Sequence, residues 1–189
     1  MRKQKKINTQ KSQKLWDEAK SIIPGGSQLL SKRAEMALPG LWPAYFKEAK
    51  GVEVTDLDGN TYVDMTHMSV GACTLGYRDP DVNKAVKQAI NKGTMSSLNA
   101  PEEVELARVL LRLHPWAGMV RYARAGGEAM SIAVRIARAH TGKDKVAFCG
   151  YHGWHDWYLS TNLASEKNLD GQHLSGLSPV GVPKSLAQT

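Results

Sequence analysis

Two glycines between a strand-like segment and a helical one are the first residues of this chain that suggest chemistry. Gly126 and Gly127 precede a run rich in Ala, Ile and Val. Amides at a helix N-terminus favour an anion, and a glycine lets a phosphate approach the backbone with no Cβ in the way. The pair belongs neither to a G-x-G-x-x-G fingerprint nor to a Walker loop. Taken alone, it is equally consistent with a phosphate cradle and with a tight turn.

A second cluster follows about twenty residues later, in the loop 151–156, which reads Tyr-His-Gly-Trp-His-Asp. In an open α/β sheet, the loops at the carboxyl ends of the strands open onto one crevice, so this loop should face the Gly126 turn. The ring of Tyr151 could stack on a planar cofactor, and the imidazole of His152 could bond to its substituents or hold it in place. The loop 151–156 thus adds a possible stacking ring and an imidazole to the crevice that the Gly126 turn should face.

Metal binding is the weaker interpretation of the same residues. His152, His155 and Asp156 could meet on one helical turn, but no further ligand with recognisable spacing accompanies them. The stretch 56–60 opens like a calcium loop, yet Thr61 stands where that loop requires glycine. The sequence therefore predicts no metal site.

Length and composition set the class of protein. The chain has 189 residues, of which 42% are apolar and 23% charged, so a disordered or collagen-like chain is excluded. No apolar run approaches the ~20 residues needed to cross a bilayer, and the basic start lacks the apolar core of a signal peptide. Cys73 and Cys149 are expected to be a reduced pair, with one disulfide as the alternative. We expect a cytoplasmic protein without membrane partners.

The net charge of +7 is concentrated at the N-terminus. Residues 1–20 hold seven basic side chains and two acidic ones, which is +5 of the total. A nucleic-acid module would spread basic residues over a folded face with a known motif. A solvated terminal arm is the favoured interpretation, and nucleic acid is not an expected partner.

Periodicity predicts the elements that position the two loops. Apolar spacing indicates a helix over 12–23, and alternation around Asp58-Gly59-Asn60 indicates a hairpin over 52–63. Further helices are predicted over 82–90 and over 101–113, the latter with proline in its first turn. These elements alternate in the manner of a mixed α and β protein.

The segment around the glycines predicts a parallel sheet. Met119–Ala123 is strand-like, Ala129–His140 is a strong helix, and Lys145–Phe148 is a second strand-like run. Strand, helix and strand within about thirty residues indicate a βαβ unit. The fold class expected is therefore α/β. Residues after Ser160 show no clear period.

Several motifs, in order along the chain, resemble those of class III aminotransferases, a family of pyridoxal-phosphate enzymes that includes the glutamate-1-semialdehyde 2,1-aminomutases. The resemblance runs from about Pro24 to Asp156 and is far more specific as an ordered set than any one motif. Its segments are Gly51–Asp64, Leu75–Pro80, Val120–Arg138, Thr141–Lys145 and Tyr151–Gly153.

The resemblance implies the N-terminal part of the type I fold of pyridoxal-phosphate enzymes, usually a homodimer. That part comprises a small N-terminal α+β segment and then the start of a mostly parallel sheet with flanking helices. The boundaries expected on this basis are a basic arm and helix at 1–23, a hairpin-containing segment at 24–80, the start of the large cofactor-binding domain at 81–159 and a loop cut short at 160–189.

The resemblance also implies the site residues. Gly126 and Gly127 would hold the phosphate of pyridoxal 5'-phosphate through their amides, Tyr151 would stack on its ring, and His152 is the neighbouring histidine. Ser69 lies near the loop that meets substrate in the aminomutases. Residues 124–127, Arg-Ala-Gly-Gly, replace the family's Asn-Ser-Gly-Thr, so two side-chain donors to the phosphate region are missing, although backbone contacts need no side chain.

Length separates this chain from the family. In the family the Schiff-base lysine, the aspartate on the pyridinium nitrogen and the partner-subunit phosphate ligand come later than the matched region, so no catalytic residue is expected before Thr189. The implied function is amino-group transfer, as an aminotransferase or aminomutase on a small amino/keto or aldehyde substrate, with this chain alone inactive. The alternatives are a non-catalytic remnant or association module and, behind it, a basic nucleic-acid-binding protein.

Overall fold

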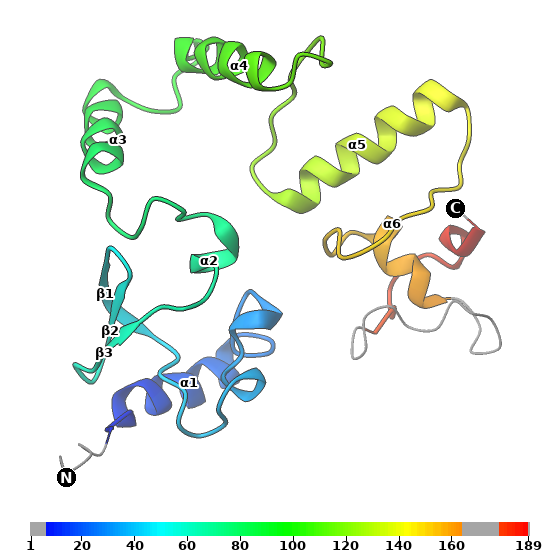
Figure 1. Ribbon diagram of the computed structural model, residues 1–189. Helices are drawn as coiled ribbons and strands as arrows, with labels where there is room; N and C mark the ends of the chain where they lie inside the picture. The colour runs from blue at the N-terminus through cyan, green and yellow to red at the C-terminus, as the bar shows by residue number, and fades with distance from the viewer. Residues whose placement is uncertain (1–6, 164–177, 189) are drawn as a thin grey trace. The chain divides into compact units, whose positions relative to one another are not determined.

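The computed structural model describes residues 7–163 and 178–188, which fall into two compact units (Figure 1). The first unit is Met1–Leu98 and the second is Asn99–Thr189. No helix in the described ranges is long and apolar enough to cross a membrane.

The first unit is built on helix α1 (Gln10–Ile22), which confirms the helix predicted there. Trp16 and Ala19, three residues apart on one face of the helix, are buried together with Ala34. The indole Nε1 of Trp16 donates to Glu35 Oε1 over 2.9 Å, so the buried ring keeps a polar partner. Two short 3₁₀ turns, η1 (Leu30–Lys32) and η2 (Ala34–Met36), close this small core.

The N-terminus of α1 is capped from a distance. The N-cap residue Thr9 makes no side-chain cap. Instead the amides of Lys11 and Ser12 donate to the two carboxylate oxygens of Asp58, over 3.0 and 3.1 Å. A carboxylate here satisfies orphan donors and complements the positive end of the helix dipole. The turn at Asp58 therefore docks the hairpin onto α1.

Three antiparallel strands follow in the order β1 (Phe46–Lys50), β2 (Glu53–Asp56), β3 (Thr61–Val63). The predicted hairpin is confirmed as β2 and β3, with Val54 paired to Tyr62. The sequence did not indicate β1, because its residues Phe-Lys-Glu-Ala-Lys lack a clean alternation and most of them are exposed.

Asp56 explains the resemblance of this turn to a calcium loop. Its buried carboxylate accepts from the amides of Asp58 and Asn60, at 2.9 and 2.8 Å, and from the hydroxyl of Tyr62 at 3.0 Å. Burial opposes ionisation, but these hydrogen bonds from Asn60, Tyr62 and Asp58 outweigh it and hold the pKa of Asp56 below its ordinary value. The acidic residues of the turn thus bind backbone and hydroxyl donors.

Two helices complete the first unit, α2 (Met68–Gly71) and α3 (Pro80–Lys92). The prediction of a helix over 82–90 is confirmed. Asp79 caps it by accepting from the amides of Asp81 and Val82, and Pro80 occupies the first turn.

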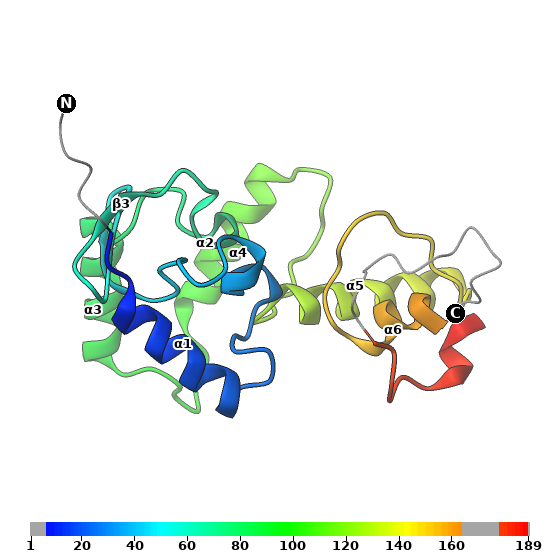
Figure 2. The same cartoon turned by 90° about the horizontal axis from the view of Figure 1, so that it is seen from below.

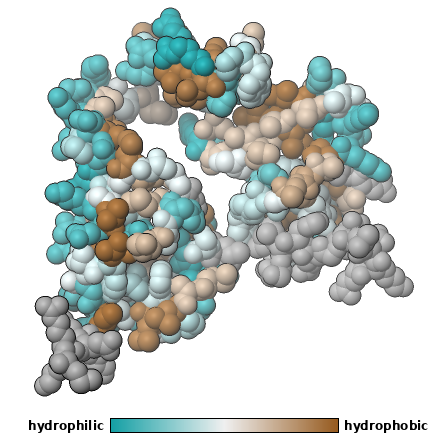
Figure 3. Space-filling model, in the orientation of Figure 1, coloured by the Kyte–Doolittle hydropathy of each residue, from teal (hydrophilic) through white to brown (hydrophobic). Residues whose placement is uncertain are grey.

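The second unit contains α4 (Pro101–Leu113), α5 (Gly126–Thr141) and α6 (Asp156–Leu159), with 3₁₀ turns η3 (Ser160–Leu163) and η4 (Lys184–Gln188). The helices predicted over 101–113 and 129–140 are confirmed. Gly142, with φ +65°, ends α5 in the left-handed conformation and returns its amide to Arg138 O. Apolar side chains lie at the surface over α4, as Figure 3 shows, and the large exposed ones are Val104, Leu106, Val109 and Leu113.

The prediction of strands at Met119–Ala123 and Lys145–Phe148 is wrong for the described residues. The sheet found in them is the antiparallel β1–β3, and neither segment forms a ladder. A strand exists through hydrogen bonds to a neighbour, and neither segment pairs with the other or with any further segment described here. Met119 is 92% exposed, in keeping with an unpaired backbone. The start of a parallel sheet is therefore absent from the described ranges.

Candidate cofactor-binding site

The N-terminus of α5 presents free donors. Gly126 is its first residue, and the N-cap Ala125 offers no side-chain cap. Within the described residues the amides of Gly126 and Gly127 make no hydrogen bond. A Cβ built on Gly126 would meet no atom within 4 Å, so there is open space beside this residue. Open amides at the positive end of a 16-residue helix suit an anionic group.

The loop after Phe148 packs against Gly127, the second residue of α5. A Cβ on Gly153, whose φ is +108°, would lie 3.0 Å from the Cα of Gly127. A Cβ on Gly127 would lie 2.7 Å from His155 Nε2. Glycine at both positions permits this approach. The two loops that the sequence placed at one crevice are therefore in contact.

Two hydrogen bonds fasten this loop to its surroundings. The indole of Trp157 donates to Ser131 Oγ on α5 over 3.1 Å. The buried Tyr158 donates its hydroxyl to Gly150 O, also over 3.1 Å. Figures 1 and 2 both show α6 and the loop before it alongside α5. The start of the loop is thus bonded to α6, and α6, which follows the loop, is bonded to α5.

Tyr151 presents an aromatic ring to the outside. The residue is 56% exposed, and its ring meets Tyr158 edge-on at a centroid distance of 5.8 Å. Partial burial, and Tyr158 after it, raise the pKa of the Tyr151 phenol, which stays neutral at physiological pH. The edge-on contact supports the ring while leaving a face available for stacking.

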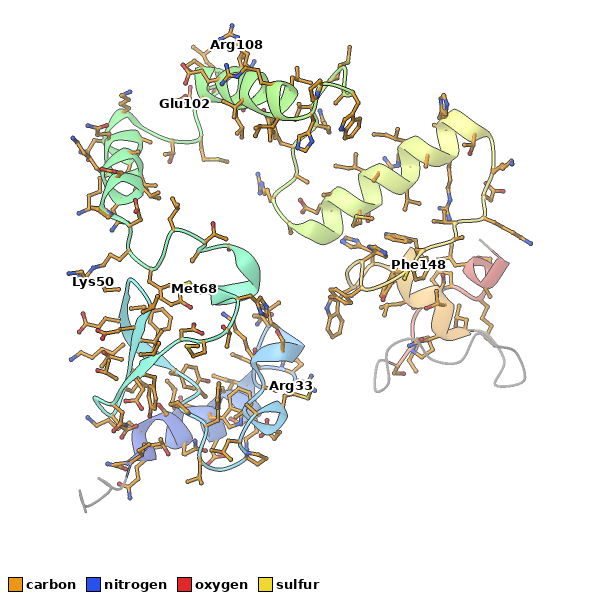
Figure 4. All side chains as sticks on the ribbon, in the orientation of Figure 1. Arg33, Lys50, Met68, Glu102, Arg108 and Phe148 are labelled. Atoms are coloured by element: carbon orange, nitrogen blue, oxygen red, sulfur yellow. The ribbon has the colours of Figure 1, made fainter. Side chains whose placement is uncertain are left out.

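His152 is turned into its own loop. Its Nε2 lies 2.8 Å from Cys149 O, and because a carbonyl only accepts, Nε2 carries the proton of this bond. Its ring packs edge-on against Phe148 and Tyr158, at 5.7 and 6.0 Å. Phe148 is labelled in Figure 4, beside α6. The imidazole therefore holds the Tyr151 loop in shape.

His155 is the residue of this region whose place the sequence did not indicate. The sequence offers His155 as a metal ligand, but its ring lies over Gly127 and makes no hydrogen bond within the described residues. The glycine at position 127 was the available signal, because a residue without a side chain lets another side chain pack directly against the backbone.

Arg124 also lies next to the N-terminus of α5. Its backbone amide donates to Glu128 Oε2 over 3.0 Å, and the guanidinium of Arg124 makes no ion pair in the part of the chain described.

Ser69 is the one residue predicted for the site that belongs to the first unit. It belongs to α2 of the first unit, and its side chain lies outside the described residues. The described side chains form no group of three or more potential metal ligands. Cys73 and Cys149 are both free thiols.

Comparison with known proteins gives this site its context. The family model for class III aminotransferases matches residues 39–184. A 3-aminobutyryl-CoA aminotransferase from Cloacimonas acidaminovorans is 39% identical over 80% of this chain and 36% of its own length. A glutamate-1-semialdehyde 2,1-aminomutase from Methylacidiphilum infernorum is 40% identical over 78% of this chain and 34% of its own. The chain thus spans about a third of the length of these relatives.

Solved structures give the same result. An omega-transaminase from Sphaerobacter thermophilus aligns with a TM-score of 0.76 at 26% identity, over 94% of this chain and 40% of the other. A glutamate-1-semialdehyde aminomutase from Pseudomonas aeruginosa aligns with a TM-score of 0.70 at 26% identity, over 94% and 38%. A transaminase with PLP bound aligns with a TM-score of 0.71 at 30% identity, over 80% and 35%. The fold expected from the resemblance, the N-terminal part of that of the pyridoxal-phosphate transaminases, is confirmed by these alignments, although the described residues do not form its parallel strands.

The cofactor of this fold suits the residues present. Pyridoxal 5'-phosphate combines a phosphate with a planar ring, and the second unit offers free helix amides beside an exposed aromatic ring. The matching family model and the PLP-bound neighbour identify it as the cofactor. The chain belongs to the class III aminotransferase family.

Proposed function

We propose that this chain takes part in pyridoxal-phosphate-dependent amino-group transfer, as part of an aminotransferase or of an aminomutase. The observation that carries the proposal is the packing of the Tyr151 loop onto the open N-terminus of α5. Bound there, the cofactor would supply an electron sink that lets an amino group move between carbon atoms.

Four residues of the second unit and one of the first have a role in this proposal. The amides of Gly126 and Gly127 bind the phosphate, where the helix dipole favours its negative charge. Tyr151 stacks on the ring of the cofactor, and His152 keeps that loop in place through its bond to Cys149 O. Ser69 contributes to the substrate side of the site.

The substrate class follows from the relatives. Their names specify an amino acyl-CoA and an amino aldehyde, so a small amino/keto or aldehyde substrate is proposed. The lysine that links the cofactor lies in the family beyond the matched region, and none of the lysines here is assigned that role. We further propose a cytoplasmic homodimer in which this chain supplies the phosphate cradle and has no turnover by itself.

A non-catalytic association module is the second candidate. It is favoured by the apolar residues exposed on α4, including Val109 and Leu113. Large contiguous patches of exposed apolar surface mark protein–protein interaction sites, among other roles. In that case the cofactor would bind weakly or not at all.

Borohydride trapping tests the proposal. The 1–189 chain would be mixed with excess pyridoxal phosphate, reduced with borohydride and mapped by peptide mass spectrometry, beside an equilibrium-dialysis measurement of cofactor binding. Saturable binding with only scattered, substoichiometric lysine labelling is the expected result. One stoichiometric adduct at a single lysine would contradict the proposed absence of the linking lysine, and absence of saturable binding would favour the association module.

A further inference from the structure

A basic groove lies in the first unit, and none of the residues assigned above lines it. It is an open surface depression of about 660 Å³, and most of the residues that line it are exposed. Four of its lining residues are cations, which come from three segments of the chain. Lys50 ends β1, Arg78 precedes α3, and Lys84 and Lys87 lie on α3. Figure 4 labels Lys50 at the end of the hairpin that faces α3.

Backbone hydrogen bonds fix the walls of this groove. Gly51 and Tyr77 exchange both amide-to-carbonyl bonds, each of 2.8 Å. This bridge ties the turn before α3 to the turn between β1 and β2. A Cβ on Gly76 would lie 3.2 Å from Gly51 O, so the two turns are in close contact. This bridge therefore brings the chain at Lys50 close to the chain at Arg78, since these residues adjoin Gly51 and Tyr77.

Helix α3 turns its polar side toward the groove. Lys84, Lys87 and Asn91 follow at helical spacing and line it. Its apolar residues Val82 and Val86, on the other side of the helix, do not line it and are about half exposed. The side of α3 that lines the groove is therefore polar.

The charge of the groove is left largely unneutralised. No carboxylate lines it. Arg78 pairs with Glu48 at 3.6 Å, and both side chains are more than half exposed, so this contact is weak. Lys50, Lys84 and Lys87 make no ion pair within the described residues. Like charges facing one groove repel one another, and a polyanion would relieve that repulsion.

We propose that this groove binds a nucleoside diphosphate. The four cations suit the two phosphates. Three carboxamides, from Asn83, Gln88 and Asn91, also line the groove and both donate and accept hydrogen bonds, as ribose hydroxyls and a base edge require. This binding is independent of the cofactor site and of the amino-transfer function.

Titration calorimetry with ADP tests the proposal. The full 1–189 chain would be compared with the double variant Lys84→Gln/Lys87→Gln and with the matched control Lys47→Gln/Lys92→Gln. The control removes the same charge from exposed lysines of β1 and α3 that do not line the groove. Far-ultraviolet circular dichroism would verify that all three proteins are equally folded.

The expected result is saturable ADP binding that weakens at least about tenfold in the groove variant and less than about twofold in the control. Inorganic pyrophosphate should bind more weakly than ADP, because it cannot use the carboxamides. The proposal is overturned if the unsubstituted chain binds no ADP up to about 5 mM, or if both variants lose affinity equally. Pyrophosphate binding as tight as ADP, or a short RNA binding more tightly than ADP, would also overturn it.

Discussion

The imidazole of His155 lies over Gly127, where a Cβ on residue 127 would come within 2.7 Å of its Nε2 and 2.8 Å of its Cδ2. This contact joins the loop that carries Tyr151 to the helix end that carries the free amides. Gly126, one residue earlier, has open space at the same place. Neighbouring glycines of the same helix turn thus differ in what surrounds them.

That difference predicts opposite responses to alanine. Gly126→Ala should raise the free energy of unfolding by about 0.5–1 kcal/mol, because alanine is the better helix residue and has less freedom when unfolded. Gly127→Ala should show no such gain, since its methyl group displaces His155. Urea unfolding measures both. In the His155→Ala background the two alanine substitutions should become equivalent, and a persistent difference there would assign the cost to something other than His155.

The proposed stacking of Tyr151 on the cofactor ring predicts how strongly each substitution of this residue weakens cofactor binding. Tyr151→Phe keeps the ring and should change the dissociation constant of pyridoxal phosphate less than about twofold, whereas Tyr151→Ala should weaken it about five- to tenfold. Equilibrium dialysis gives both constants. The hydroxyl rather than the ring would be the binding group if the phenylalanine variant lost as much affinity as the alanine variant.

The hydrogen bonds that Asp58 accepts from the first turn of α1 predict that this hairpin residue stabilises the helix. Asp58→Ala removes both acceptors from the amides of Lys11 and Ser12 and should cost about 1–2 kcal/mol of unfolding free energy. The control Asp17→Ala removes an equal charge from an exposed ion pair with Lys20 and should cost less than about 0.5 kcal/mol. Equal losses in the two variants would mean that net charge, and not capping, is responsible.

The hydrogen bond from the Tyr77 hydroxyl to Asp64 Oδ2, of 2.6 Å, predicts the pH dependence of stability. The hydrogen bond to Asp64, together with burial, raises the pKa of the Tyr77 phenol to about 12. The stability that this bond contributes is therefore fully present below pH 10 and is lost as the pH rises toward 12. Hydrogen bonds from Tyr77 and Thr66 hold the pKa of Asp64 below its ordinary value of 3.8. Stability present above that value is therefore lost as the pH falls below it.

Tyr77→Phe tests both limbs in one variant. Urea unfolding between pH 2 and 12 should show a shallower loss of stability at each end than in the unsubstituted protein. Tyr62, whose pKa burial and a bond to Asp56 also raise to about 12, remains as a second source of alkaline dependence, so the alkaline limb is reduced and not abolished. Superimposable pH profiles would show that the 2.6 Å bond does not couple to folding.

The helices were predictable because their signals are local. Pro80 and Pro101 mark helix starts, and Gly142 marks a helix end, whatever the rest of the chain does. The β2–β3 hairpin was equally predictable, since its turn residues and alternation are adjacent in sequence. Strand β1 was not, because it depends on pairing with β2 more than on its own pattern.

The prediction of two strands on either side of α5 in sequence was wrong for the same reason, because a strand depends on its pairing partner. Met119–Ala123 and Lys145–Phe148 have strand-like composition, but a strand also needs a neighbour to hydrogen-bond with, which composition does not supply. The contact between the Gly126 turn and the Tyr151 loop was predictable, because the order of the two segments along the chain grouped them together. The bond between Trp157 and Ser131 and the position of His155 could not be predicted, because they arise from packing between residues 26 or more apart in sequence.

Binding of the cofactor phosphate by backbone amides of α5 can be tested at Gly126. Proline is tolerated at the first position of a helix, and the extended Ala125, with φ −137° and ψ 155°, suits the residue before proline. Gly126→Pro therefore removes one amide donor and keeps the helix, while Gly126→Ala adds a side-chain carbon and keeps the donor.

The decisive measurement is the dissociation constant of pyridoxal phosphate for these two variants and the unsubstituted chain, by equilibrium dialysis, with circular dichroism to verify equal helix content. The account predicts at least about tenfold weaker binding for Gly126→Pro and a clearly smaller loss for Gly126→Ala. Unchanged affinity in the proline variant would contradict a phosphate site at the N-terminus of α5.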